Sequence, residues 1–220
     1  MVRVKICGIT SIEDLMIAER FGADAAGLLV GQAHPSPDFI SLAKAKEICQ
    51  SASPYTTLVM VTHLEDTKEI VRLAQDISCR VVQLHSDLSS EDTKKLRELL
   101  RPKLLFAKVS VENDSAIERA KALESCADGI VLDSKDPATG RVGGTGKVHD
   151  WNISARIVKE SKIPVVLAGG LTPENVKQAI LQVKPWAVDV NSGVKGADGK
   201  KSVEKVRSFV EAAKKAGMEG

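Results

Sequence analysis

The chain has 220 residues, of which 43% are hydrophobic, 27% are charged and 3% are aromatic, and its formal net charge is +2. These values are typical of a globular protein with one large domain or two small ones, and they argue against nucleic acid or an anionic membrane as a partner. No apolar run is long enough to span a bilayer, and residues 1–10 lack the pattern of a secretory signal, so we expect a cytoplasmic location.

Short apolar runs alternate with longer amphipathic segments along the chain. Most of these runs are continuous rather than alternating, which is typical of parallel strands buried on both faces. The expected strands are residues 3–7, 25–30, 56–61, 79–84, 103–108, 128–132, 164–167 and 186–190.

Helix signals fall between the expected strands. Ser11 and Ser41 are expected N-caps, and Gly22 is expected at the C-terminal cap of the first helix. Thr172 is expected to cap a later helix, with Pro173 at its first position. Further helical segments are residues 89–100, 151–160 and 201–217, of which 151–160 has the weakest pattern.

Eight strand–helix units in a chain of this length predict a single (β/α)8 barrel domain over residues 1–220. The alternative is an open doubly wound sheet, which usually carries a glycine-rich turn after its first strand. The C-G-I-T stretch at residues 7–10 is no such turn. In a barrel the C-terminal ends of the strands face the active site, so side chains at those ends are the functional candidates.

Two glycine-containing loops follow the seventh and eighth strands. They read L-A-G-G-L-T-P-E-N-V over residues 167–176 and D-V-N-S-G-V-K-G over residues 189–196. Loops after these two strands commonly bind phosphate in barrels, because glycine lets backbone N–H groups approach an anion closely. The sequence therefore predicts a phosphate site at Gly169, Gly170, Ser192 and Gly193. The alternative is that the glycines only form tight turns.

Two residues with acid–base chemistry end the first and sixth strands. Cys7 is either an ordinary buried thiol or a thiolate base. Asp133 is either a loop cap or a general acid whose pKa is raised by its apolar surroundings. Because both strands end at one rim, the pair could move protons at different atoms of one phosphorylated sugar.

Other polar residues are less informative. His85 follows the fourth strand, where it either shapes the pocket or caps its loop. The glycine-rich segment 143–151, with Lys147, is expected to be a lid or a phosphate-adjacent loop and lacks the full nucleotide-binding pattern. Scattered cysteines without a C-x-x-C pair predict reduced thiols, and histidines without ligand spacing predict no metal site. These residues are Cys7, Cys49, Cys79, Cys126, His34, His63 and His149.

Several stretches together resemble phosphoribosylanthranilate isomerase of tryptophan biosynthesis. They occur in order over nearly the whole chain, and their combination is specific although each is weak alone. The stretches are V-K-I-C-G-I-T (4–10), V-Q-L-H (82–85), L-D-S-K (132–135), G-G-T-G-K (143–147), A-G-G-L-T-P-E-N-V (168–176) and V-D-V-N-S-G-V (188–194).

The resemblance implies a (β/α)8 barrel without a cofactor. It implies that N-(5-phosphoribosyl)anthranilate is rearranged to 1-(2-carboxyphenylamino)-1-deoxyribulose 5-phosphate, with Cys7 as general base and Asp133 as general acid. Lys5 should share a face with Cys7, where its ammonium either lowers the thiol pKa or only pairs with a carboxylate inside the barrel. The expected partner is a small phosphosugar, and the expected state is a monomer or homodimer.

The chain departs from the family pattern around the aryl end of the substrate. Asp38 stands where the family has the arginine that holds the anthranilate carboxylate, in a loop about two residues longer. Two carboxylates repel each other, so the usual contact is expected to be absent or reversed, with His34 or Lys44 as possible compensation. Lys195 replaces an acid after S-G-V, and Ser86 and Ser202 are further departures.

These departures leave alternatives open. A paralogue could keep the phosphosugar site and accept a different aglycone near Asp38. A metal-dependent epimerase on the same fold would need several His or Asp ligands at strand ends, and we find no such set. A non-catalytic phosphosugar-binding barrel would have no need for Cys7 and Asp133.

Overall fold

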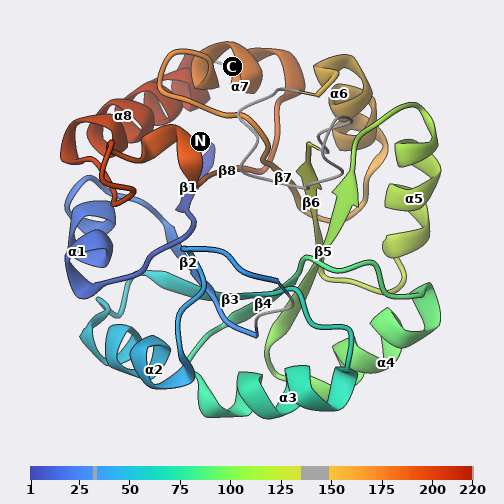
Figure 1. Ribbon diagram of the computed structural model, residues 1–220. Coiled ribbons are helices and arrows are strands. Elements are labelled where there is room, and N and C mark those ends of the chain that lie inside the picture. The colour runs from blue at the N-terminus through green and yellow to red at the C-terminus, as the bar shows by residue number, and fades with distance from the viewer. Residues whose placement is uncertain (32–33, 135–148, 220) are drawn as a thin grey trace.

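A computed structural model of the chain describes residues 1–31, 34–134 and 149–219. Its strands form one closed parallel barrel in the order of the sequence, and the first strand pairs with the last (Figure 1). The predicted barrel is therefore confirmed, and the open sheet is excluded. The strands are β1 (Arg3–Ile6), β2 (Ala25–Leu29), β3 (Thr57–Thr62), β4 (Val81–Leu84), β5 (Leu104–Ser110), β6 (Gly129–Asp133), β7 (Val165–Leu167) and β8 (Ala187–Val190).

Helices surround the barrel as an outer ring (Figure 1). The Ser11 and Ser41 side chains cap their helices as predicted, by accepting hydrogen bonds from backbone N–H groups, and Gly22 follows the first helix with φ +82°. The helices are α1 (Ile12–Arg20), α2 (Leu42–Ser51), α3 (Thr67–Asp76), α4 (Ser90–Leu99), α5 (Ser115–Leu123), α6 (Trp151–Glu160), α7 (Val176–Val183), the short 3₁₀ helix η1 (Ser192–Val194) and α8 (Val203–Glu219).

The predicted start of α7 is wrong. The helix begins at Val176 with Asn175 as its N-cap, so Thr172 and Pro173 lie in the preceding turn. The Asn175 side chain explains this difference, because it accepts from Thr172 N at 2.8 Å and donates to Gly170 O at 2.9 Å. These hydrogen bonds connect the turn to the loop after β7, and the helix begins only after the bonded residues.

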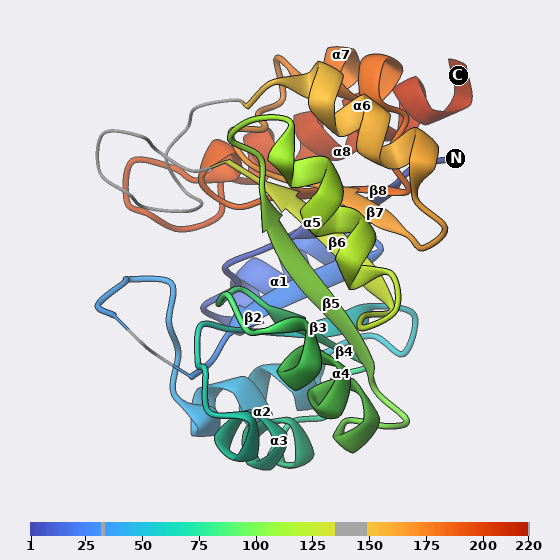
Figure 2. The same cartoon turned by 90° about the vertical axis from the view of Figure 1, so that its right-hand side faces the viewer.

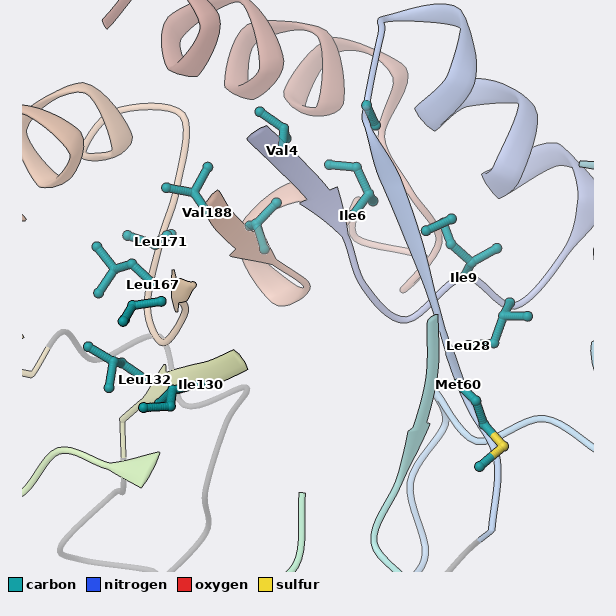
Figure 3. Packing of buried hydrophobic residues seen from close by; sticks show 14 of the residues in the cluster. Val4, Ile6, Ile9, Leu28, Met60, Ile130, Leu132, Leu167, Leu171 and Val188 are labelled. Carbon is teal, nitrogen blue, oxygen red and sulfur yellow. The ribbon is translucent and has the colours of Figure 1, made fainter. Parts of the chain in front are cut away.

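Side chains alternate between the two faces of each strand. Val4 and Ile6 of β1 point outward and pack with the inner faces of the helices, and Figure 3 shows them beside Val188 in this outer cluster. Lys5 and Cys7 have the opposite parity and point into the barrel, where Cys7 joins a second apolar cluster. The outer faces of the strands are apolar, and the inner faces combine apolar side chains with a few buried polar ones such as Lys5, which explains the mostly continuous apolar sequence.

The barrel has two different ends. In Figure 2 the loops after β2 and after β8 project from one end, and the chain termini lie at the other (Figure 2). Parallel strands place all their C-terminal ends together, so these loops belong to the rim that carries active sites in barrels. Within the described part of the chain, no helix is both long and apolar enough to cross a membrane.

Candidate active site

Cys7 lies directly after β1 and inside the rim. Its backbone N–H donates to Val190 O at 2.8 Å, which extends the ladder between β1 and β8 by one residue. The residue is 8% exposed and borders the interior cluster. The position one residue beyond the strand thus turns a thiol toward the space enclosed by the rim, as the strand-end pattern predicted.

Lys5 lies one step deeper in the barrel and has carboxylate and amide partners. Its ammonium donates to Asp189 Oδ2 at 2.6 Å and to Gln83 Oε1 at 2.8 Å, and both ionic side chains are buried. Lys5 therefore pairs with a carboxylate inside the barrel, and its charge also acts to lower the pKa of Cys7. Burial acts to lower the pKa of Lys5, but Asp189 and Cys7 together raise that pKa above its usual value.

The pKa of the Cys7 thiol is raised by burial. The Lys5 ammonium acts to lower this pKa, and the Asp189 carboxylate acts to raise it. In the unliganded protein the effect of burial exceeds that of Lys5, so these surroundings favour the thiol form of Cys7 over the thiolate. A positive charge that develops on a bound substrate would favour the thiolate.

Asp133 is the last residue of β6 and is 5% exposed. Its Oδ1 accepts a hydrogen bond from Ser134 N at 2.7 Å, and its Oδ2 lies 3.5 Å from His85 Nε2. Burial raises the pKa of Asp133 to about 7, against the Ser134 N–H, which acts to lower it. A carboxyl group that keeps its proton near neutral pH can serve as a general acid.

Cys7 and Asp133 face the same enclosed space. The pKa values of both groups respond to Lys5 and Asp189, so each lies within electrostatic reach of the same two side chains. β6 and β1 are separated by β7 and β8 in the closed barrel, which places the thiol and the carboxyl group across the rim from one another. A ligand that spans the rim can therefore meet both groups.

The loops after β7 and β8 pack against each other beside Asp133. Gly169 has φ +79°, and a Cβ there would lie 2.9 Å from Asp133 Oδ1. At Gly193 a Cβ would lie 2.0 Å from Leu171 O, so only glycine permits this approach. Within the described residues, none accepts a hydrogen bond from the backbone N–H of Gly169, Gly170, Ser192 or Gly193. This arrangement suits an anion.

Aromatic side chains line the rim above β2, β3 and β4. The His63 ring lies 5.2 Å from the Phe39 ring and 4.6 Å from the His85 ring, measured between centroids, and His34 packs on the first two. Burial and His34 lower the pKa of His63 to about 4, so this ring is neutral. Sequence reasoning placed His85 near the pocket but missed this wall, whose signal is an aromatic residue after each of three successive strands.

Asp38 lies at the rim and is paired. Its Oδ1 accepts from Lys195 Nζ, and its Oδ2 accepts from Asn191 Nδ2 at 2.9 Å. Lys44, one of the two residues suggested as compensation, pairs with Glu47 at 3.0 Å on α2 rather than with Asp38. The partner of Asp38 is Lys195, the second residue at which the sequence departs from the family pattern.

Some expectations fall outside the described residues or receive no test. Lys147 and the rest of segment 143–148 lie outside the described residues. His149 follows that segment and bridges Ser134 Oγ at 3.0 Å to Ser154 Oγ at 2.7 Å. Across residues 1–31, 34–134 and 149–219, no group of three or more His, Cys, Asp or Glu side chains could hold a metal ion.

Comparisons with known proteins agree with this geometry. A family profile described as N-(5'phosphoribosyl)anthranilate (PRA) isomerase matches residues 4–212. N-(5'-phosphoribosyl)anthranilate isomerase 2 of Methanosarcina mazei is 44% identical over 213 residues, which cover 97% of this chain and 94% of the relative. The corresponding isomerase of Haloferax volcanii is 38% identical over 98% of this chain and 95% of its own length.

Solved structures give the same result. Phosphoribosyl anthranilate isomerase from Thermotoga maritima superposes with a TM-score of 0.86 at 36% identity, covering 98% of this chain and 100% of that one. A phosphoribosyl anthranilate isomerase in complex with reduced 1-(o-carboxyphenylamino)-1-deoxyribulose 5-phosphate superposes with a TM-score of 0.83 at 34% identity and the same coverage. The chain belongs to the N-(5'-phosphoribosyl)anthranilate isomerase family.

Proposed function

We propose that residues 1–220 form one catalytic domain that isomerises N-(5'-phosphoribosyl)anthranilate, with Asp133 as general acid and Cys7 as general base. The observation that carries this assignment is the placement of a buried carboxyl group with a raised pKa and a thiol across one rim, beside a loop pair suited to phosphate. Family membership supports anthranilate as the aglycone over the alternative of a paralogue with a different aglycone near Asp38.

The first step in this proposal is ring opening. Asp133 donates its proton to the furanose oxygen while the C1–O bond breaks, and the nitrogen lone pair forms a C=N bond. The product is a protonated Schiff base, and Asp133 becomes a carboxylate. The pKa of about 7 leaves a large share of Asp133 protonated in neutral solution, so the acid is available without further activation.

The second step is proton removal from C2. The Schiff base acidifies this C–H bond, and its positive charge favours the thiolate form of Cys7 in the way that Lys5 does. The C2–H electron pair forms the C1=C2 bond, and the C=N electrons return to nitrogen. The resulting enolamine becomes the ketone when C1 takes up one proton and the C2 hydroxyl group releases one.

The phosphate is assigned to the backbone N–H groups of Gly169, Gly170, Ser192 and Gly193. No described acceptor competes for these groups, and a phosphate held there would lie beside Asp133 because Gly169 contacts that carboxyl group. His85 is assigned to the pocket wall next to Asp133, which favours pocket shaping over loop capping. A cytoplasmic location and a monomeric or homodimeric state stay predictions, although one Thermotoga maritima relative is described as dimeric.

The activity assay generates phosphoribosylanthranilate in situ and follows the loss of its fluorescence with wild type, Cys7→Ser and Asp133→Asn. We expect turnover by wild type and a fall of about three orders of magnitude or more in kcat for each variant. Circular dichroism would establish that both variants are folded. Near-wild-type turnover by either folded variant would contradict its assigned role, and an inactive wild type would contradict the function itself.

A further inference from the structure

Two separate departures from the family pattern are in contact in this structure. Asp38 replaces the arginine expected after β2, and Lys195 replaces the acid expected after η1. They lie 157 positions apart in sequence, and the Lys195 ammonium donates to Asp38 Oδ1. Lys195 directly follows η1, so the cation of this ion pair is on the β8 side of the contact.

The ion pair joins the two loops that flank the catalytic end of β1. In the barrel β1 lies between β8 and β2, and Lys195 belongs to the loop after β8 while Asp38 belongs to the loop after β2. Figure 2 shows both loops projecting from the same end of the barrel (Figure 2). Cys7 occupies this end, and Phe39, which follows Asp38, packs on the interior cluster that contains Cys7.

Neighbouring bonds hold the pair in place. Asn191 donates to the second oxygen of Asp38 at 2.9 Å and accepts from Lys201 Nζ at 2.9 Å. The Asn191 side chain itself lies against Gly8, where a Cβ would be 2.4 Å from Asn191 Oδ1. Both oxygens of Asp38 thus have donors, so its carboxylate is an anchor for Lys195 rather than a free negative charge.

Lys195 keeps capacity for a second acceptor. An ammonium group carries three N–H donors, and among the described residues Asp38 is the one acceptor for the Lys195 side chain. The Lys195 side chain is 17% exposed and that of Asp38 is 14% exposed, so the pair is shielded but open on one side. Charge-assisted hydrogen bonds in such partly dry surroundings are stronger than those between neutral groups.

The substrate requires a second anion site at a defined place. In phosphoribosylanthranilate the same number of covalent bonds separates C2 from the phosphorus atom and from the carboxylate carbon. With C2 at Cys7 and the phosphate on the loops after β7 and β8, we expect the aryl group to extend away from the phosphate, toward β2, β3 and β4. There it meets the neutral rings of Phe39 and His63, next to the ion pair.

We propose that Lys195, held by Asp38, binds the carboxylate of the anthranilate group and so determines specificity for a carboxylated aglycone. This inference rests on the proposed function, because that function places C2 at Cys7. The sequence predicts that a carboxylate at position 38 leaves the usual contact absent or reversed; in this proposal the cation that contacts the substrate is Lys195, the partner of that carboxylate.

The test compares two substrates that differ only in the carboxylate, N-(5'-phosphoribosyl)anthranilate and N-(5'-phosphoribosyl)aniline. Each forms by condensation of ribose 5-phosphate with the arylamine, and chromatography follows both products. For Lys195→Met and Lys195→Gln we expect kcat/KM on the anthranilate substrate to fall about tenfold to a hundredfold, mainly through KM. On the aniline substrate we expect a change of less than about twofold, and Lys195→Arg should retain most of the preference.

Lys44→Met is the matched control, because Lys44 is a cation at the start of α2 that pairs with Glu47 away from Asp38. It should leave both kcat/KM values unchanged. Equal losses on both substrates in the Lys195 variants would indicate a structural role and overturn the inference, as would an unchanged preference. A wild type with equal activity on both substrates would overturn this inference alone, and a wild type inactive on both would overturn the proposed function with it.

Discussion

Replacing Asp133 by asparagine should make the stability of the protein respond differently to pH. The carboxyl group has a pKa of about 7 in the folded protein and an ordinary value of 3.8, so the folded state binds this proton more tightly than the unfolded state. Stability of the wild type therefore decreases as pH rises from 3.8 to about 7. At about 1.4 kcal/mol per pH unit, the buried carboxylate costs about 4 kcal/mol above this interval.

The asparagine variant removes that cost and retains the local hydrogen bond. The carboxamide oxygen can still accept from Ser134 N, which lies 2.7 Å from Asp133 Oδ1. Urea unfolding of wild type and Asp133→Asn at pH 4 and at pH 8 measures the effect. We expect the stability of the variant relative to wild type to increase by about 4 kcal/mol between the two pH values, while catalytic activity is lost.

Asp128→Asn provides a control of opposite sign. Burial acts to raise the pKa of Asp128, but hydrogen bonds from Leu105 N and Arg97 and the charge of Arg97 hold that pKa below its ordinary value. The Asp128 carboxylate stabilises the fold at pH values above the pKa that it has in the unfolded chain, and this stabilisation is lost as pH falls. Asp128→Asn should therefore be most destabilised, relative to wild type, near neutral pH. A pH-independent difference between Asp133→Asn and wild type would refute the raised pKa and the acid role that depends on it.

Three further predictions concern the same site. In the proposed mechanism the active enzyme carries a proton on Asp133 and none on Cys7, so the two groups together hold one proton. Because the pKa of the Cys7 thiol is higher than that of Asp133, kcat/KM should rise about tenfold per pH unit up to pH 7 and then level off. A decline in kcat/KM just above pH 7 would contradict this proton count. Gly193→Ala places a methyl group against Leu171 O and should weaken inorganic phosphate binding about tenfold or more by calorimetry; unchanged affinity would remove this loop from the phosphate site. Lys5→Met leaves the Asp189 carboxylate buried without its cation, and we expect the free energy of unfolding in urea to fall by about 3–5 kcal/mol. Because Lys5 acts to lower the pKa of Cys7, the variant should also react more slowly with iodoacetamide at Cys7. An unaltered alkylation rate would show that Lys5 does not influence the thiol.

The barrel could be predicted from the sequence because its signals are local. Continuous apolar runs such as residues 25–30 identify strands buried on both faces, and Ser11 and Ser41 mark helix starts through their own hydrogen bonds. The start of α7 could not be predicted in this way. Thr172 carries the same capping signal, and it is overridden by the bonds that the Asn175 side chain makes with the loop before it.

The candidate site was predictable where position along a strand decides it. Cys7 directly follows β1 and Asp133 ends β6, and the C-terminal ends of all strands of a parallel barrel lie at one rim. The contacts between loops could not be predicted. In the sequence Asp38 and Lys195 are two unrelated departures from the family pattern, and only the closed barrel brings the loops on either side of β1 together. The pKa of the Cys7 thiol depends on the balance between burial and the charge of Lys5, and this balance follows only from the three-dimensional surroundings.

The central claim is that a sulfur atom and a carboxyl group act on one sugar from a common rim. A crystal structure of this protein with reduced 1-(o-carboxyphenylamino)-1-deoxyribulose 5-phosphate tests it most directly. We predict the Cys7 sulfur in contact with C2, the Asp133 carboxyl group hydrogen-bonded to the C4 oxygen, and the phosphate on the amides of Gly170 and Gly193. A ligand bound with its phosphate elsewhere, or with C2 out of contact with Cys7, would contradict the account.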